Sequence, residues 1–282
     1  MISLPAERTG HRALPDLAQR RAAMETARCA GAWTVSAPPE EIVLGGRRAL
    51  RFKPQGAARA RMLHMHGGAF RLGCPEIEGP FVRALADRCG VEIIVPAYRL
   101  APEHPFPAGL NDALTVLRAC PRDVPLILSG DSAGGGLAAS VTLLALAEGV
   151  KLAGLVMLSP WLDLTVSAAS YQANALNDPL FSQESAASGA VLYLQGQDPE
   201  TPLASPLFAD LTGFPPSLIS VGTGEVLADD AAAMHQRLCA AGVASQLCMI
   251  DGMDHVAVVR GMALPGSAQT FAVVAAFVDG LC

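Results

Sequence analysis

Short apolar runs alternate with longer amphipathic stretches from residue 61 to the end of the chain. The apolar runs have the length of buried strands and cover residues 62–65, 92–96, 126–129, 154–158, 217–221 and 246–250. The stretches with helical spacing lie between or after them, near residues 78–89, 108–120, 137–148, 226–241 and 267–281. Strands that alternate with helices form a mostly parallel sheet with helices on both faces. The pattern therefore predicts an α/β fold.

Three segments depart from this alternation. The N-terminal stretch has the spacing of one or two amphipathic helices, and residues 41–44 and 47–53, joined by Gly45-Gly46, have the pattern of a β-hairpin. After residue 160 the chain becomes rich in Ser, Ala, Asn and Gln, over a length that exceeds an ordinary connection. We therefore expect N-terminal cap helices at 1–40, an α/β core at 41–160 and 207–282, and a cap insertion at 161–206.

Charge and hydropathy exclude several classes of partner. The formal net charge of the 282 residues is −6, and the charges are scattered singly, so there is no basic face for nucleic acid and no polybasic membrane segment. Apolar runs such as 137–147 are too short to span a bilayer. Residues 1–30 lack the apolar core and cleavage site of a signal peptide, so we expect a cytoplasmic protein. The sequence leaves the oligomeric state open, and a homodimer is one alternative.

The chain has seven cysteines, an odd number without a Cys-x-x-Cys pair. This spacing argues against a disulfide framework and against a zinc site. We expect reduced and mostly buried thiols, none of which is a nucleophile. The cysteines are Cys29, Cys74, Cys89, Cys120, Cys239, Cys248 and Cys282.

The strongest candidate for chemistry follows the apolar run at 126–129. Gly130-Asp131-Ser132-Ala133-Gly134 leads directly into the helical stretch that begins near Leu137. A strand, a Gly-x-Ser-x-Gly turn and a helix form an elbow that exposes the serine hydroxyl above the sheet, and a Cβ at either glycine would collide with the neighbouring strand or helix. The N-terminus of the following helix favours negative charge beside the serine. The alternative is a glycine-rich turn with an incidental serine, but Ser132 is the predicted nucleophile.

A second candidate lies after the run at 62–65, at His66-Gly67-Gly68-Ala69-Phe70. Ligands of open α/β sheets bind at the carboxyl ends of the strands, so this turn is expected near Ser132. The backbone N–H groups freed by the small residues, together with that of Ala133, could bind the oxyanion of a tetrahedral intermediate. The alternative is a tight turn that needs glycine for its geometry.

The remaining candidates follow the last two apolar runs. His255 lies just past the run at 246–250, where an imidazole can reach the serine and act as a general base. Glu225 lies just past the run at 217–221 and can orient that imidazole, whereas Asp229 and Asp230 come a turn later and are expected to cap or solvate a helix. The order serine, acid, histidine along the chain distinguishes His255 from the other five histidines. Among these, we expect His64 in a strand, His66 bracing its own turn, and His11, His104 and His235 in structural or exposed positions.

Together these motifs resemble the hormone-sensitive-lipase-like bacterial carboxylesterases within the α/β-hydrolase fold. The resemblance covers roughly residues 60–260 and implies that Ser132 is the nucleophile, His255 the base and Glu225 the acid, with Gly67, Gly68 and Ala133 as the oxyanion hole. Besides the two glycine motifs, it rests on Tyr98-Arg99-Leu100-Ala101-Pro102-Glu103, Ser159-Pro160-Trp161-Leu162-Asp163-Leu164, Ser205-Pro206-Leu207, Pro215-Pro216 and Asp254-His255.

Two positions depart from the family pattern. The family usually has a third glycine where this chain has Ala69, and its acid segment is often Asp-Pro-Leu where this chain has Glu225-Val226-Leu227. The resemblance implies hydrolysis of small-molecule esters through an acyl-enzyme, which requires neither metal nor cofactor. The expected cap is of modest length and rich in small and polar residues, with few aromatics, which predicts a preference for short acyl chains. A lactone hydrolase or deacetylase with the same triad stays open. A ligand-binding receptor on this fold is a more remote alternative, because its usual mark is a lost base and His255 is present.

Overall fold

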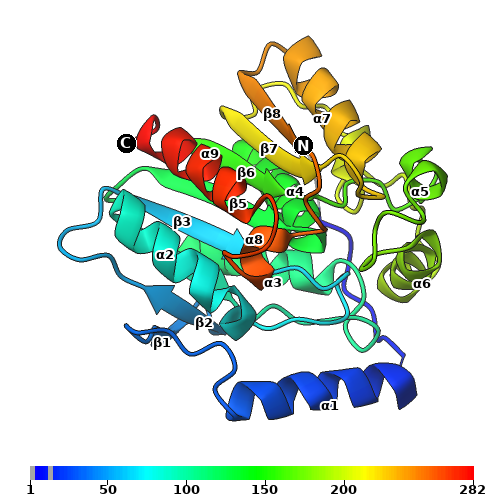
Figure 1. Ribbon diagram of the computed structural model, residues 1–282, viewed down its shortest axis with the longest axis horizontal. Coiled ribbons are helices and arrows are strands. Elements are labelled where there is room, and N and C mark those ends of the chain that lie inside the picture. Colours follow the sequence, from blue (N-terminus) through cyan, green and yellow to red (C-terminus); the bar gives the residue numbers. More distant parts are fainter. Residues whose placement is uncertain (1–3, 12–14) are drawn as a thin grey trace.

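The computed structural model describes residues 4–11 and 15–282, which form an eight-stranded sheet flanked by helices (Figure 1). The strand order is β1-β2-β4-β3-β5-β6-β7-β8. β2 pairs antiparallel with β1 and β4, and all other neighbours are parallel. The predicted α/β class and the N-terminal hairpin are confirmed. The strands are β1 (Glu40–Leu44), β2 (Arg47–Phe52), β3 (Ala60–Met65), β4 (Val91–Pro96), β5 (Leu126–Asp131), β6 (Gly154–Leu158), β7 (Ser217–Gly222) and β8 (Ser245–Ile250).

Helices cover both faces of the sheet. α2 (Gly79–Cys89) and α9 (Ser267–Asp279) lie side by side on the face turned to the viewer in Figure 1. The opposite face is covered by α3 (Ala108–Ala119), α4 (Ala133–Ala147) and α7 (Ala228–Ala240). Successive strand residues point to opposite faces, so Met62 and Leu63 of β3 belong to two different apolar clusters. This two-sided burial is the reason why the central strands are mostly apolar, with a few buried polar residues such as His64 and Ser129.

α4 is the most deeply buried helix of this arrangement. All of its residues from Ala133 to Ala145 are buried, because it packs on β5 and β6 and also contacts α3. Its uniformly apolar sequence follows from burial on all sides. None of the helices within residues 4–11 and 15–282 combines the length and the apolar character needed to cross a membrane.

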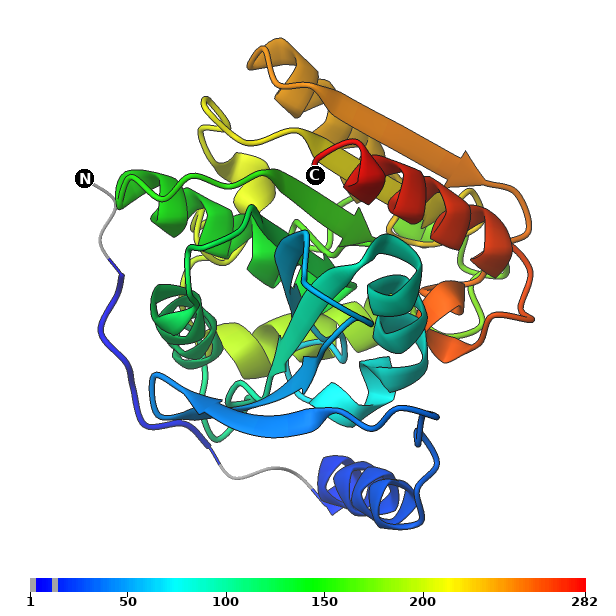
Figure 2. The same ribbon diagram turned by 90° about the vertical axis from the view of Figure 1, so that its left-hand side faces the viewer.

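Short helices surround the carboxyl ends of the parallel strands. Between β6 and β7 the chain forms α5 (Ser170–Ala173), α6 (Gln183–Leu194) and the 3-10 turn η2 (Pro206–Phe208). Nearer the termini are α1 (Pro15–Cys29), η1 (Pro75–Glu78) and α8 (Ala257–Arg260). α1, the one helix in the described part of residues 1–40, lies at the lower edge of Figure 1 and at the same edge in Figure 2.

α1 is fixed to the core mainly by Arg21. The guanidinium donates two hydrogen bonds of 2.8 Å to the carboxylate of Glu103 and further ones to the carbonyl oxygens of Arg71 and Ala101. Three of these four contacts reach the loop that contains the predicted Tyr98 to Glu103 motif. The N-terminal helix is thereby held close to the turn that follows β3.

The cysteine prediction was wrong in part. All seven thiols are free, but only Cys89 and Cys120 are buried. Cys29, Cys239 and Cys282 are exposed, because they lie on the outer face of α1, on the outer face of α7 and at the end of the chain. The usual tendency of free cysteine to be buried therefore does not hold for thiols near helix ends or at the terminus.

Candidate active site

Ser132 occupies the sharp turn between β5 and α4, as the single residue that joins Asp131 to Ala133. Its backbone has φ 51° and ψ −123°, an unusual conformation that costs a non-glycine residue about 1–3 kcal/mol. The strand and the helix approach closely, because a Cβ added at Gly130 would lie 2.2 Å from the carbonyl oxygen of Gly134. The chain thus has the predicted strand, turn and helix, with the strain concentrated at the serine.

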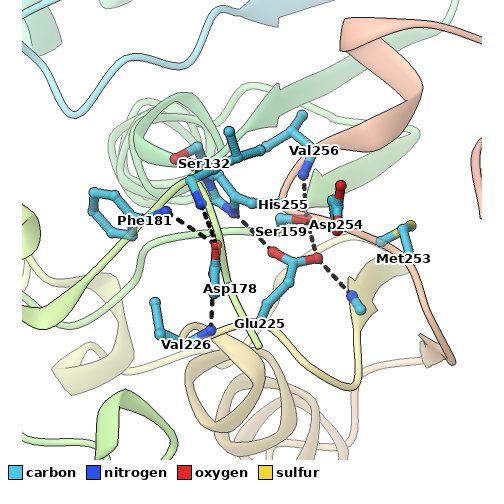
Figure 3. A network of polar contacts seen from close by, with 12 residues as sticks. Ser132, Ser159, Asp178, Phe181, Glu225, Val226, Met253, Asp254, His255 and Val256 are labelled. Atoms are coloured by element: carbon cyan, nitrogen blue, oxygen red, sulfur yellow. Dashed lines mark hydrogen bonds and ion pairs between the residues drawn. The ribbon is translucent and has the colours of Figure 1, made fainter. Parts of the chain in front are cut away.

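Side chains from three loops form a continuous hydrogen-bonded chain (Figure 3). Ser132 Oγ lies 2.9 Å from Nε2 of His255, and Nδ1 of this imidazole lies 2.7 Å from Oε2 of Glu225. When Nδ1–H donates to the carboxylate, Nε2 is free to accept the hydroxyl proton of the serine. The structure therefore brings together three residues that the sequence placed at separate strand ends.

The carboxylate of Glu225 is held on both oxygens and is 1% exposed. Oε1 accepts hydrogen bonds from Ser159 Oγ at 2.8 Å and from the N–H of Gly222 at 2.6 Å, while Oε2 faces His255. Ser159 Oγ in turn accepts a hydrogen bond from the N–H of Val256 at 3.2 Å. One hydroxyl therefore links the acid to the loop that carries the histidine. Ser159 begins the motif that ends at Leu164, but its contact with the acid was not predicted from the sequence.

The surroundings of His255 raise its pKa above the ordinary value. Burial alone favours the neutral imidazole and lowers the pKa, but the hydrogen bond to Glu225 and the negative charge of that carboxylate outweigh this effect. The charge of Asp178 acts in the same direction. The imidazole is therefore a stronger base than a free histidine, and the chain can stabilise the imidazolium form.

Asp178 and Phe181 belong to the site although the sequence did not single them out. Asp178 Oδ1 accepts hydrogen bonds from the N–H groups of Leu180 and Phe181, both at 3.0 Å, and Oδ2 accepts one from the N–H of Val226 at 3.1 Å (Figure 3). The carboxylate therefore joins the segment before α6 to the turn after Glu225. No local pattern marks it, because its partner in space comes 48 residues later.

The turn at His66 to Phe70, here called the glycine turn, presents free backbone donors. Within residues 4–11 and 15–282, the N–H groups of Gly67, Gly68 and Ala133 donate to no backbone or side-chain acceptor. Gly67 and Gly68 line the same pocket as Ser132. Ala69 has a φ of 51°, a left-handed conformation in which glycine is usual. The chain adopts the turn despite this substitution.

His66 braces the glycine turn, as predicted. Its Nδ1 lies 2.8 Å from the carbonyl oxygen of Gly67, and its ring is stacked on Tyr98 with centroids 4.2 Å apart. Tyr98 Oη donates a 2.6 Å hydrogen bond to the carbonyl oxygen of His66. Burial lowers the pKa of His66 and keeps it neutral. The contacts with Tyr98 show that the motif from Tyr98 to Glu103 helps to fix the shape of the glycine turn.

A pocket with a volume of about 290 Å³ opens above Ser132 and His255. Its walls come from α1, the glycine turn with the residues that follow it, the segment between β6 and β7, and the region of α8. The apolar wall residues are Met24, Leu72, Ile77, Leu180, Phe181 and Val259. This volume is at the small end of the range for small-molecule sites.

A buried ionic cluster lies beneath the pocket. Nε2 of His64 is 3.1 Å from Oε2 of Glu78 and 3.6 Å from Oδ1 of Asp131, and its Nδ1 is 3.0 Å from Ser129 Oγ. Burial lowers the pKa of His64, but the contacts with the two carboxylates, a hydrogen bond to Glu78 and an ion pair with Asp131, outweigh it and raise the pKa to about 9. Burial and the charge of Asp131 raise the pKa of Glu78 to about 7. His64 is therefore a protonated strand residue that compensates two buried acids.

Two groups of described residues have ligand atoms close enough together for a metal ion. They are the cluster of His64, Glu78 and Asp131, and the group formed by Asp178, Glu225 and His255. In both groups the imidazole already hydrogen-bonds a carboxylate. This hydrogen bond accounts for the close approach of Glu78 to His64 and of Glu225 to His255.

The other acids near the histidine have different contacts. Asp229 is exposed on the first turn of α7, as expected, and also accepts a hydrogen bond from the N–H of Ser170. The expectation was wrong for Asp230, which is buried and accepts hydrogen bonds from the N–H groups of Leu162 and Asp163. Both carboxylates hold the chain after β6 rather than their own helix. Asp254 lies 3.7 Å from Arg260 and is half exposed, although it is adjacent to His255.

Comparisons with known proteins agree with this geometry. Residues 62–259 match the model of a protein family whose description is 'alpha/beta hydrolase fold'. The chain is 38% identical over 212 residues to an acetyl-hydrolase of Streptomyces hygroscopicus, covering 73% of this chain and 71% of that protein. It is 35% identical over 248 residues to an esterase of Acinetobacter venetianus, covering 85% and 81% of the two chains. The crystal structure of an esterase from the bacterial hormone-sensitive lipase family has a TM-score of 0.87 and 34% identity, covering 96% of this chain and 93% of that one.

These likenesses confirm the resemblance predicted from the motifs and the predicted class of enzyme, a carboxylic ester hydrolase. Together with the fold and the extent of the family match, they allow one conclusion. The chain belongs to the hormone-sensitive-lipase-like esterases of the α/β-hydrolase fold.

Proposed function

We propose that the protein hydrolyses short-chain acyl esters with Ser132 as nucleophile, His255 as general base and Glu225 as the acid that orients it. The observation that carries the proposal is the hydrogen-bonded chain from Ser132 to Glu225 beside the three unpaired amides of Gly67, Gly68 and Ala133. A nucleophile, a base and donors for negative charge are the parts that acyl transfer requires.

The reaction proceeds through an acyl-enzyme. Ser132 Oγ attacks the ester carbonyl carbon while His255 Nε2 takes the hydroxyl proton, and the three free amides bind the oxyanion. The intermediate collapses, and His255 returns the proton to the departing alcohol. Water then attacks the acyl-serine with His255 as base again, which releases the acid. Glu225 stays ionised and stabilises the imidazolium in both halves.

In our proposal, the described part of residues 1–40 and residues 161–206 form the cap over this site. Residues 1–3 and 12–14 of the predicted cap lie outside the described residues. The pocket wall supports this cap, since it includes Met24 from α1 and Leu180 and Phe181 from the insertion. The pocket volume of about 290 Å³ supports acyl groups from acetyl to hexanoyl, and the name of the acetyl-hydrolase relative points to the same short chains. A deacetylase or lactone hydrolase would use the same residues.

The cytoplasmic location and the homodimer remain predictions. Fractionation of the host cell tests the first, and light scattering on the purified protein tests the second. Neither affects the chemistry proposed for Ser132.

A panel of p-nitrophenyl esters from acetyl to palmitoyl tests the proposed function. We expect kcat/KM to be highest between acetyl and hexanoyl, and Ser132→Ala to lower kcat by several orders of magnitude while the protein remains folded. Circular dichroism of the variant provides the control for folding. Near-normal turnover by Ser132→Ala would contradict the serine mechanism, and a rate that rises up to palmitoyl would contradict the short-chain preference.

A further inference from the structure

One wall of the pocket beside Ser132 carries a buried guanidinium without an acidic partner. Arg71 follows the glycine turn, lines the pocket and is 8% exposed. Its Nη1 donates to Ser188 Oγ, and its Nη2 donates to the carbonyl and hydroxyl oxygens of Ser185, each at 3.0 Å. Its Nε has no acceptor. Throughout the described part of the chain, no carboxylate forms an ion pair with Arg71.

The charge of Arg71 is poorly compensated. Burial lowers its pKa, and the positive charge of Arg20 lowers it further, opposed by the negative charge of Asp16. Because a guanidinium stays protonated in proteins, the protein carries this cost as an unpaired buried charge. Arg20 comes from α1 and lines the same pocket. Two cations therefore converge on one cavity, although like charges repel.

The other charged residues of the pocket have opposite charges beside them. Arg260 lies 3.7 Å from the carboxylate of Asp254. Glu78 and Asp131 also line the cavity, and the imidazolium of His64 behind them offsets one of their two negative charges. Among the described residues that line the pocket, Arg71 and Arg20 are the cations without an ion pair.

A purely structural role does not explain this arrangement. The hydrogen bonds from Arg71 to Ser185 and Ser188 attach the residues after the glycine turn to α6, and a neutral donor could form them without the cost of a buried charge. Of the five N–H groups of a guanidinium, these bonds use three, which leaves two. These are the Nε–H, which is buried, and one N–H of Nη1. A carboxylate oxygen accepts a charge-assisted hydrogen bond from the free N–H of Nη1. A negatively charged ligand would supply what the protein lacks.

We propose that the pocket accepts esters that carry a second, ionised carboxyl group, which binds to Arg71 and is attracted by Arg20. This inference rests on the proposed ester hydrolysis and specifies its substrate class. The ester carbonyl lies at Ser132, and the free carboxylate lies on the arginine side of the same cavity, away from Glu78 and Asp131. Simple neutral esters are poorer substrates because they leave the buried charge unpaired.

Matched pairs of esters test this proposal on each side of the scissile bond. The pair for the alcohol side is 4-acetoxybenzoate and 4-acetoxybenzamide, and the pair for the acyl side is monomethyl adipate and its terminal amide. The two members of a pair differ in charge but hardly in size. We expect kcat/KM to be about tenfold or more higher for the carboxylate in at least one pair, which corresponds to one hydrogen-bonded charge contact. This preference should decrease as salt is added.

Four variants assign the preference to particular residues. Arg71→Gln, which retains N–H donors for Ser185, should abolish the preference, and Arg71→Lys should retain part of it. Arg20→Gln should reduce it about two- to threefold, as expected for an exposed charge. Lys151→Gln is the matched control, because Lys151 is an exposed cation outside this pocket. This variant should leave kcat/KM unchanged for the carboxylate and for the amide of each pair. Equal rates within both pairs, or a preference that persists in Arg71→Gln, would overturn the proposal.

Calorimetry separates this inference from the proposed function. Ser132→Ala cannot turn over an ester but retains the pocket, so it should bind monomethyl adipate more tightly than the terminal amide. If the parent hydrolyses neutral esters but Ser132→Ala binds the two compounds equally, the inference fails and the esterase proposal stands. If no ester is hydrolysed but the carboxylate binds through Arg71, the esterase proposal fails and the anion site stands. If Arg71→Gln does not fold, Arg20→Gln and the salt dependence decide the matter.

Discussion

The ring of Phe181 is stacked on the imidazole of His255, with centroids 5.5 Å apart and planes inclined by 12°. Asp178 holds this ring in place, because its carboxylate accepts the N–H of Phe181 and, on its other oxygen, the N–H of Val226. One carboxylate therefore connects the segment that packs on the base to the turn that carries Glu225. Asp178 touches no reacting atom, so we assign it a positioning role.

The first prediction concerns Asp178→Asn. The carboxylate accepts the N–H of Phe181 on one oxygen and the N–H of Val226 on the other. The amide has a single acceptor oxygen, so one of these two hydrogen bonds is lost. We expect kcat to fall about 10- to 100-fold, since displacement of a catalytic group by about 1 Å can cost this much. KM should change less, because the pocket walls remain. Steady-state kinetics with p-nitrophenyl butyrate measures both constants.

Asp198→Asn is the matched control. Asp198 also accepts a backbone N–H, from Glu200, and lies between β6 and β7 away from the site. It should have parental kcat and KM. If both variants lost the same modest activity, or if Asp178→Asn changed KM alone, the positioning role would be wrong.

The second prediction is the pH dependence of turnover. The pKa of His255 is raised because Glu225 and Asp178 outweigh burial, and only the neutral imidazole acts as a base. The acidic limb of kcat/KM should therefore have an apparent pKa above about 6.5, the ordinary value of histidine. Both Glu225→Gln and Asp178→Asn should shift this limb to lower pH. An acidic limb in the parent that falls below 6, or stays in place in both variants, would contradict this assignment.

The third prediction concerns the stability conferred by the buried cluster. The pKa of His64 is raised to about 9 in the folded state, so the imidazolium stabilises the fold fully below the unfolded pKa, and this stabilisation is lost as pH rises through 9. Between pH 7.5 and 9.5 the free energy of unfolding should fall by about 1–3 kcal/mol. Glu78, with a pKa raised to about 7, contributes a similar loss at lower pH. Urea titration at several pH values measures both.

His64→Gln should flatten this dependence above pH 7.5. His104→Gln is the control, because His104 is exposed and lies outside the cluster. It should leave the curve of the parent unchanged. Equal slopes in the parent and in His64→Gln would show that other groups titrate in this range.

The sequence predicted most of the fold because the central strands are buried on both faces. β3, β4, β5, β6 and β7 are buried at every position, which produces predominantly apolar runs, and the intervening helices have a clear period. β8 shows the limit of this reasoning. As the edge strand it is only partly buried, yet its composition resembles that of the inner strands.

The site was predictable where its residues follow strands, and not elsewhere. Ser132, Glu225 and His255 each follow a strand at the same edge of the sheet, so topology places them together. Asp178 lies in the insertion and reaches the site through tertiary packing, and Arg71, although it directly follows the glycine turn, has its partners Ser185 and Ser188 in the insertion. No spacing rule relates either residue to its partners. His64 was correctly placed in a strand, but its charge depends on two acids from other elements and could not be inferred from the chain.

Asp229 provides the sharpest comparison for the role of Glu225. It comes four residues after Glu225, on the first turn of α7, and its carboxylate is exposed and accepts the N–H of Ser170 at 2.8 Å. Glu225 instead lies 2.7 Å from His255 Nδ1 and is buried. The two acids thus differ in contact with the imidazole, although both follow β7. Asparagine at position 229 keeps an acceptor for Ser170, which makes the substitution mild.

The last prediction follows from this difference. Glu225→Gln should lower kcat by roughly 10²- to 10⁴-fold, because the amide orients the imidazole poorly and cannot stabilise its charge, while the nucleophile and the free amides remain. The free energy of unfolding should change little, because the amide oxygen can still accept from Ser159 and Gly222. Asp229→Asn should retain kcat within a few-fold of the parent. Kinetics of the two purified variants against p-nitrophenyl acetate decides the assignment: if their phenotypes were exchanged, Asp229 would be the acid and the contact between Glu225 and His255 would be structural.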